Sequence, residues 1–143
     1  MRFMIIRKAD QQTEAGVMPS EQLLTDMTTY NEEMFKAGVL LAGEGLHPSA
    51  KGARVKFGTD GKPLVVDGPF AETKELIAGF TMIQTNSLAE ALEWVKRWPA
   101  SDAPVELEIR QVFEAEEFGA EFTPEMRAVE DQMRAQLEKP KQK

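Results

Sequence analysis

The sequence contains no cysteine and only one histidine in 143 residues. Without cysteine there is no disulfide, thiolate nucleophile or sulfur-rich metal site, which is compatible with a reducing cytoplasm. One histidine leaves too few nitrogen ligands for a typical zinc shell. The sequence patterns of P-loops, dinucleotide-binding folds, zinc proteases and serine hydrolases are also missing. We therefore expect neither a metal nor a cofactor.

Long apolar runs and an excess of positive charge are missing as well. The N-terminal apolar run has four residues, and the longest one elsewhere covers only residues 39–42, so we expect no signal peptide and no membrane span. Seventeen basic and twenty-four acidic residues give a net charge of −7, which on average repels nucleic acid and anionic membranes. We expect a cytoplasmic protein that binds neither directly.

The patterns that are present predict one α+β domain. Apolar runs and alternation predict strands at residues 3–6, 39–42, 79–84 and 105–110, with a hairpin at 54–66 that turns at Asp60-Gly61. Helices are expected from Ser20 to Gly38 and from Ser87 to Pro99. The order βαβ, hairpin, βαβ fits a ferredoxin-like sheet, in which both helices cover one face and leave the other open for a partner.

A last helix is predicted after Thr123-Pro124, with one apolar stripe formed by Met126, Val129, Met133 and Leu137. We divide the chain into a domain at residues 1–118 and a helical extension at residues 119–143, which should dock on the body or on a second subunit. A stripe that contains methionine suits ordinary packing and also suits contact with another protein.

Two segments contain candidate site residues. His47 is the only imidazole, and it follows a strand in a glycine-rich loop beside Glu44, where it could transfer protons or simply bond to water or backbone. Asp67 begins D-G-P-F, where we expect a turn in which its side chain accepts from an amide two residues on. Glu72, Lys74 and Glu75 follow within one expected helical turn. This segment suits a rigid turn and also suits a ligand-facing carboxylate at Asp67.

Glu108 and Arg110 alternate with the apolar residues of the last predicted strand, which places both on the uncovered sheet face. If a second sheet stacks there, the two become a partly buried acid and base with shifted pKa values. The alternative is an ion pair that fixes the register of the interface.

Several stretches together resemble the DGPF-domain family, a branch of the YCII-related proteins. The resemblance rests on D-G-P-F with Glu72, Lys74, Glu75, Gly79 and Phe80, and on A-G-V-L-L-A-G-E-G-L-H-P-S, S-L-A-E-A-L-E-W and E-I-R-Q-V. It implies a ferredoxin-like fold that pairs sheet to sheet as a dimeric α/β barrel. The loop that contains D-G-P-F, Glu72, Lys74 and Glu75, here called the signature loop, would line a cleft in that barrel. Smaller YCII-like relatives carry a histidine near the start of the first helix as part of a histidine–aspartate dyad, whereas here that helix has none and His47 lies after the second strand.

The hypothesis is a homodimer that binds a small polar or carbonyl-bearing molecule in this cleft. The expected cleft residues are His47, Asp67, Glu72, Lys74, Glu75, Glu44, Glu108 and Arg110. If the protein is an enzyme, His47 or Asp67 would transfer a proton and Lys74 or Arg110 would hold an anionic intermediate. Because many relatives resemble products encoded beside extracytoplasmic-function sigma factors, the alternative is a non-enzymatic regulatory module with a sigma factor as its partner.

Overall fold

The computed structural model describes residues 1–140 and divides the chain into two compact units, Met1–Val112 and a second that begins at Phe113. The strands of the first unit are β1 (Arg2–Lys8), β2 (Leu40–Gly45), β3 (Ala53–Phe57), β4 (Pro63–Asp67), β5 (Ile77–Gln84) and β6 (Leu107–Gln111). Its α-helices are α1 (Gln11–Glu14), α2 (Glu21–Lys36) and α3 (Leu88–Val95). The second unit contains α4 (Pro124–Leu137).

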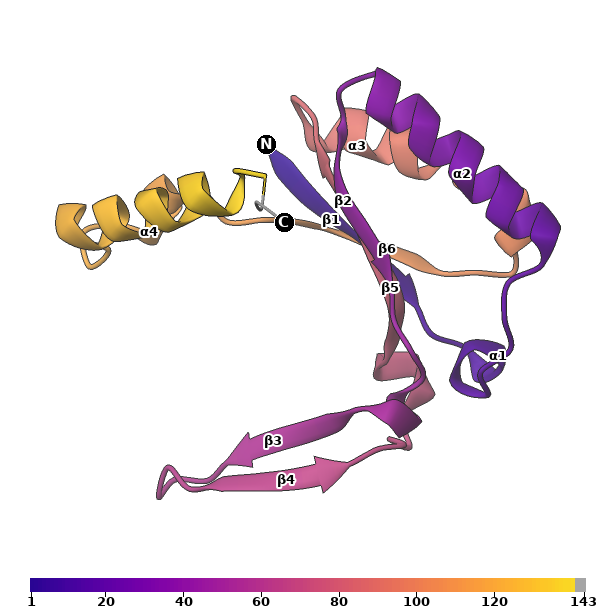
Figure 1. The fold of residues 1–143 in the computed structure, drawn as a ribbon, viewed down its shortest axis with the longest axis horizontal. Coiled ribbons are helices and arrows are strands. Elements are labelled where there is room, and N and C mark those ends of the chain that lie inside the picture. The colour runs from indigo at the N-terminus through magenta and orange to yellow at the C-terminus, as the bar shows by residue number, and fades with distance from the viewer. Residues whose placement is uncertain (141–143) are drawn as a thin grey trace. The chain divides into compact units, whose positions relative to one another are not determined.

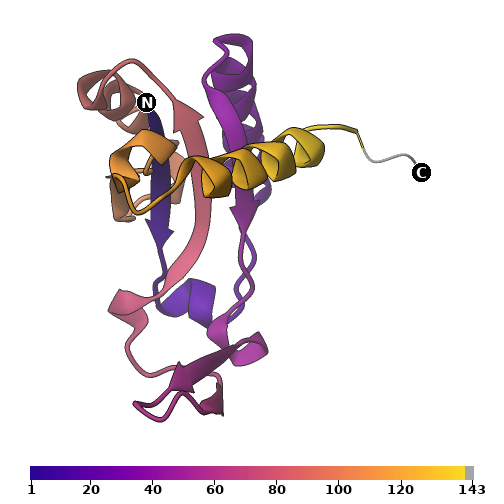
Figure 2. The same ribbon diagram turned by 90° about the vertical axis from the view of Figure 1, so that its left-hand side faces the viewer.

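Four strands form one antiparallel sheet in the order β2-β5-β1-β6, and β3 pairs with β4 in a separate hairpin. Helices α2 and α3 lie on the same side of the sheet (Figure 1). Seen from another side, β1, β5 and β2 run next to one another, and the hairpin lies beyond one end of them (Figure 2). The predicted mixed α+β architecture and the inserted hairpin are therefore confirmed.

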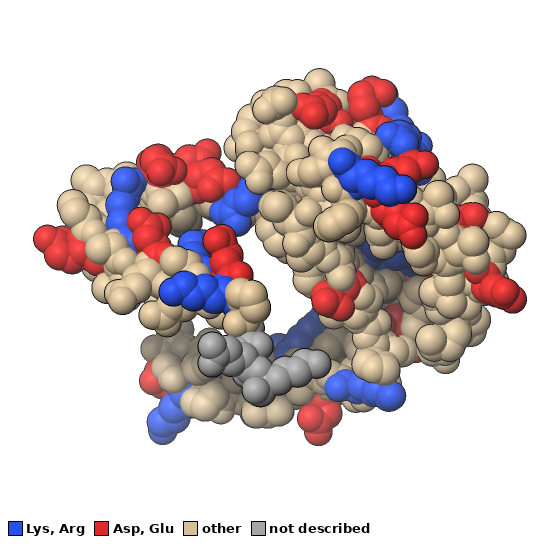
Figure 3. All heavy atoms as spheres, turned by 45° about the horizontal axis from the view of Figure 1, so that its top comes forward, with Lys and Arg blue, Asp and Glu red and all other residues tan. Residues whose placement is uncertain are grey.

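The hydrophobic core lies between the sheet and the two helices. It consists of Phe3, Ile5, Tyr30, Met34, Val39, Ile83 and Ala91. The helices begin where their caps predict: the amide of Leu23 donates to Ser20 Oγ at 3.1 Å, and the amide of Glu90 donates to Ser87 Oγ at 3.1 Å. Acidic and basic side chains are mixed over the outer surface of these helices (Figure 3). Glu33 of α2 forms an ion pair with Arg97, which follows α3 in the sequence.

Strand β2 is longer than predicted because its glycines continue the sheet instead of ending it. Gly43 pairs with Thr81 and Gly45 pairs with Gly79 of β5. A Cβ atom at Gly79 would lie 2.8 Å from the backbone oxygen of Glu44, so the absence of a side chain there lets the two strands approach. Helix α1 was not predicted. Asp10 is its N-cap, and the Asp10 side chain accepts a hydrogen bond from the amide of Thr13.

The second unit combines aromatic contacts with a helix whose apolar stripe is exposed. The Phe118 ring lies 5.2 Å from that of Phe113 and 5.7 Å from that of Phe122, measured between centroids. Thr123 caps α4, as predicted, by accepting from the amide of Met126.

Of the helices within residues 1–140, none has the length and apolar character needed to cross a membrane.

Candidate ligand-binding face and signature loop

The sheet face that α2 and α3 leave uncovered has an apolar centre. The strand register forms two rows on it, Arg110–Met4–Met82–Ala42 and Glu108–Ile6–Phe80–Glu44. Met4, Ile6, Phe80 and Met82 occupy the two central strands and are half-buried. An apolar sheet face of this kind is normally covered by another layer of structure.

Charged side chains border this apolar centre on both edge strands. Glu108 and Arg110 project from β6, as the alternation predicted, and Glu44 projects from β2 at the other edge. All three are exposed. Glu44 and Glu108 share one row but are three strand spacings apart, about 14 Å, so they do not meet across the sheet.

The D-G-P-F turn is held by the segment that follows β2, where Ser49–Lys51 forms one turn of 3₁₀ helix. The amide of Gly68 donates to the carbonyl oxygen of Gly52 at 2.9 Å. The amide of Phe70 donates to Ser49 Oγ at 3.0 Å, and Ser49 Oγ donates to Glu14 Oε2 at 2.5 Å. The amide of Ser49 donates to Glu14 Oε1 at 3.0 Å. Glu14 of α1 thus fixes Ser49, and Ser49 fixes the turn.

Close packing explains the glycine and the phenylalanine of this turn. A Cβ atom at Gly68 would overlap the backbone carbonyl of Ser49, so only glycine fits without a shift of the backbone. The Arg54 guanidinium lies 3.9 Å from the centroid of the half-buried Phe70 ring, within cation–π distance. The predicted role of Asp67 in the turn is wrong, because Pro69, two residues on, has no amide hydrogen to donate.

The charged residues around the signature are not used to build the fold. His47, Asp67, Glu72, Lys74 and Glu75 are all exposed. The predicted helical turn is present as a short 3₁₀ helix at Thr73–Glu75. Within residues 1–140, none of these five side chains forms a hydrogen bond or an ion pair, and the same holds for Glu44, Glu108 and Arg110. Their charges are free to meet a ligand or a partner.

Sequence reasoning missed Glu14 and Ser49. They lie 35 residues apart, so no local pattern joins them. The only local signal was the cap of α1, where Asp10 accepts from Thr13 and Thr13 Oγ1 accepts from the amide of Asp10. The hydrogen bond from the Thr13 amide lowers the pKa of Asp10, although burial opposes this shift.

A second polar cluster lies on the helix-covered side of the sheet. Arg7 donates through Nη2 and Nε to both carboxylate oxygens of Asp102, at 2.7 and 3.1 Å, and the indole of Trp98 donates to Asp102 Oδ2 at 2.9 Å. The hydrogen bond to Asp102 raises the pKa of Arg7. Because its groups are mutually paired, this cluster is structural. Within residues 1–140, no group of three acidic or imidazole side chains is placed to hold a metal ion.

Comparison with known proteins identifies the family. The sequence model of the YCII-related domain matches residues 1–116. The chain belongs to the YCII-related family. An uncharacterised protein of Rhizobium meliloti (strain 1021) is 36% identical over 76 residues, which span 53% of this chain and 60% of that protein, less than two thirds of its length.

Among solved structures, the chain resembles a 5-chloro-2-hydroxyhydroquinone dehydrochlorinase from Burkholderia phenoliruptrix AC1100, determined in complex with 2,5-dihydroxybenzoquinone. The alignment covers 82% of this YCII-related chain and 98% of the enzyme, with 12% identity and a TM-score of 0.43. At this level of similarity, neither the reaction nor the ligand of that enzyme extends to this chain.

Proposed function

We propose that the protein is a homodimer that binds a small polar molecule between the open faces of two sheets. The observation that carries this proposal is the open face itself, where apolar side chains form a floor bordered by the unpaired charges of Glu44, Glu108 and Arg110. A second sheet would cover the apolar centre and leave these charges at the rim of a cleft. The strand order, with both helices on one face, supports a ferredoxin-like fold of the kind that forms dimeric α/β barrels.

The signature loop would close one end of this cleft. The loop and His47 lie where β2 ends and β5 begins, because the amide of Leu46 donates to the carbonyl of Ala78 at that point. Asp67 lies at the base of the hairpin, paired with Ala53. His47 or Asp67 would act as the proton-transfer group, and Arg110 or Lys74 would hold an anionic oxygen of the bound molecule.

Mass measurement and ligand screening test the proposal together. Light scattering should give the mass of a dimer, and a thermal-shift screen of small carboxylic acids and carbonyl compounds should find ligands whose binding is weakened by His47→Ala, Asp67→Asn and Arg110→Gln. Glu32→Gln, on an exposed turn of α2, is the matched control. A monomeric mass would contradict the proposal. Unchanged ligand binding in all three site variants would contradict the claim that the ligand binds in this cleft.

A second candidate is a non-enzymatic regulatory module that contacts an extracytoplasmic-function sigma factor. The exposed apolar stripe of α4 favours a protein contact, since Met126, Val129 and Met133 are between 46% and 57% exposed. The binding affinity of the purified protein for a co-encoded sigma factor, measured with the wild type and with Val129→Asp, would test this candidate. Equal affinities would argue against the stripe as the contact.

A further inference from the structure

Lys8, the last residue of β1, lies on the open face of the sheet and was not predicted as a site residue. Arg7, directly before it, contacts Asp102 on the helix-covered side, and successive side chains of a strand point to opposite faces. The register between β1 and β5 shifts here by one residue, Ala78, which belongs to β5. The alternation of β1 therefore continues to Lys8.

The side chain of Lys8 has no partner, although its backbone is held on both sides. Its amide donates to the carbonyl oxygen of Glu106 at 3.1 Å, and its own carbonyl oxygen accepts from Arg7 Nη1 at 2.8 Å. Lys8 is half-buried, whereas Arg110 and Lys74 are exposed. Within residues 1–140, the Lys8 ammonium forms neither a hydrogen bond nor an ion pair. The fold does not use this charge.

Lys8 lies at the end of the open face where the signature loop and His47 are found. The amide of Ala9 donates at 2.9 Å to the carbonyl oxygen of Leu76, directly after the loop. On the other side of β5, the amide of Leu46 donates to that strand, and His47 comes next in the chain. The backbones of β1 and β2 are two strand spacings apart, about 10 Å. Lys8 and His47 therefore begin from the same end of the face.

Helix α1 joins this end of β1 to the D-G-P-F turn. Arg7 Nη1 donates to Asp10, the N-cap of α1, at 3.3 Å, and Glu14 at the other end of α1 accepts from Ser49. Because Ser49 also holds the turn, hydrogen bonds connect the strand that contains Lys8 to the signature loop. A binding site at this corner would be preorganised, which lowers the cost of ligand binding.

An anionic ligand would give the Lys8 ammonium the partner that it lacks. When a second sheet covers the open face, the ammonium loses water and needs an opposite charge. Glu106 and Glu108 lie on the β6 side, but neither forms an ion pair with Lys8 within residues 1–140. Arg110 is two rows further along the face, and Lys74 lies close to two glutamates in the sequence. Lys8 is thus the cation best placed beside His47.

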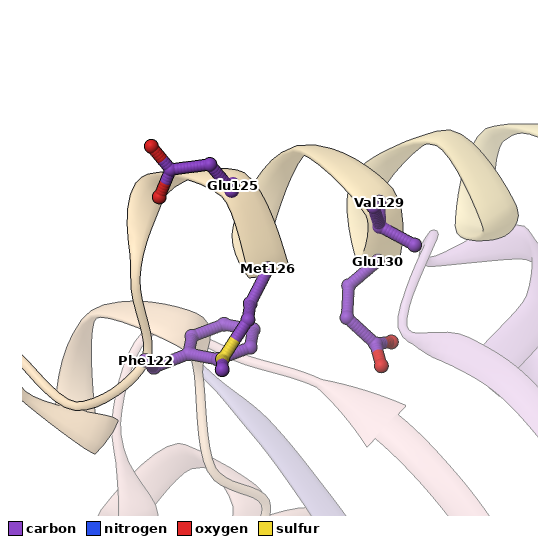
Figure 4. A pocket seen from close by; sticks show the side chains of 5 residues that line it. All are labelled: Phe122, Glu125, Met126, Val129 and Glu130. Atoms are coloured by element: carbon purple, nitrogen blue, oxygen red, sulfur yellow. The ribbon is translucent and has the colours of Figure 1, made fainter.

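The groove beside α4 is less suited to an anion. It is lined by Phe122, Glu125, Met126, Val129 and Glu130, so both charged residues that line it are acidic. Met126 and Glu130 point to the side where the Phe122 ring lies, whereas Glu125 points away from it (Figure 4). The carboxylate of Glu130 would repel an anion there.

We propose that the ammonium of Lys8 binds the carboxylate of a small ligand at the end of the open face beside His47. This inference rests on the proposed ligand-binding cleft, and it assigns to Lys8 the role of holding the anion that Arg110 or Lys74 would otherwise have. A lysine ammonium presents three donors on a flexible stem, so it can follow the carboxylate as the ligand settles in the cleft.

Titration with pyruvate, which has a carboxylate and a carbonyl group, tests this assignment. In protein labelled with ¹³C at lysine Cε, the Lys8 signal is the one missing from the spectrum of Lys8→Gln. It should shift saturably with pyruvate at constant ionic strength, and not with uncharged pyruvamide. Lys8→Gln should weaken pyruvate binding about tenfold, as for loss of a charged hydrogen bond, and Lys8→Arg should stay within about threefold of the wild type. Lys36→Gln, on an exposed position of α2, is the matched control and should change nothing.

The variants separate failure of this inference from failure of the proposed cleft. Undiminished pyruvate binding in Lys8→Gln, together with weaker binding in His47→Ala and Arg110→Gln, would overturn the inference and leave the cleft intact. Unchanged binding in all three variants would overturn both. A wild-type Lys8 signal that does not shift saturably with pyruvate would also overturn the inference. So would equal losses of stability in urea, or of dimer mass, in Lys8→Gln and Glu106→Gln, because the ammonium would then pair with a carboxylate of the protein.

Discussion

Tyr30 is the only tyrosine in the chain, and the structure predicts that it resists ionisation. Its side chain is 3% exposed, and its hydroxyl donates to the carbonyl oxygen of Trp94 at 2.8 Å. The ring meets that of Trp98 edge to face, with centroids 5.7 Å apart. Burial raises the pKa of the Tyr30 hydroxyl from 10.0 to about 12, with the charge of Arg97 acting in the opposite direction.

This shift makes the stability of the fold sensitive to alkaline pH. Below pH 10 the hydroxyl is protonated in both the folded and the unfolded chain, so the contribution of Tyr30 is fully present. Between pH 10 and about 12 the unfolded chain loses the proton first, so the free energy of unfolding falls by about 1.4 kcal/mol per pH unit. A shift of two pKa units corresponds to a total loss of about 3 kcal/mol.

Two measurements test this prediction. Tyrosinate absorbance should rise with a midpoint near pH 12 in the folded protein and near 10 in urea. Urea unfolding at several pH values should show a steeper loss of stability in the wild type than in Tyr30→Phe. This variant leaves no unpaired carbonyl, because Trp94 also accepts from the amide of Arg97, so it should lose only about 1 kcal/mol at neutral pH. A folded-state midpoint near 10, or parallel pH dependence in the two proteins, would refute the reasoning.

Two further predictions concern the signature turn. Gly68→Ala should lower the free energy of unfolding by about 1–3 kcal/mol because the new methyl group overlaps the Ser49 carbonyl, whereas Gly45→Ala, with no atom within 4 Å, should change it far less; equal effects in urea unfolding would contradict this account. Ser49→Ala should accelerate hydrogen exchange of the Phe70 amide about tenfold, since that amide loses its acceptor, and should leave the core amide of Ile83 unchanged. Unaltered exchange at Phe70 would show that the turn is held without Ser49.

Most of the fold could be predicted from the sequence because its signals are local. Ser20, Ser87 and Thr123 begin their helices as the capping patterns indicate, and Asp60-Gly61 lies at the tip of the predicted hairpin. The end of β2 could not be predicted in this way. Gly43 and Gly45 suggested a break, but their structural role depends on β5, a strand more than thirty residues away in sequence.

The candidate site was only partly predictable for the same reason. The alternation of apolar and charged residues correctly placed Glu108 and Arg110 on the open face, because successive side chains of a strand point to opposite faces of the sheet. The hydrogen bonds from Glu14 to Ser49 and from Ser49 to Phe70 join three segments that are far apart in sequence. The role of Asp67 in its turn was predicted incorrectly because the position two residues on was treated as an amide donor although it is proline.

The charges of the signature therefore need an explanation outside the fold. Gly68 and Phe70 are accounted for by packing, whereas Glu72, Lys74 and Glu75 are exposed and make no ion pair within residues 1–140. Replacing all three with glutamine should change the free energy of unfolding by about 0.5 kcal/mol or less per site, as for surface residues without partners. If urea unfolding shows that stability is retained while ligand binding or dimer mass changes, these charges serve recognition. A large loss of stability would instead mean that they support the turn.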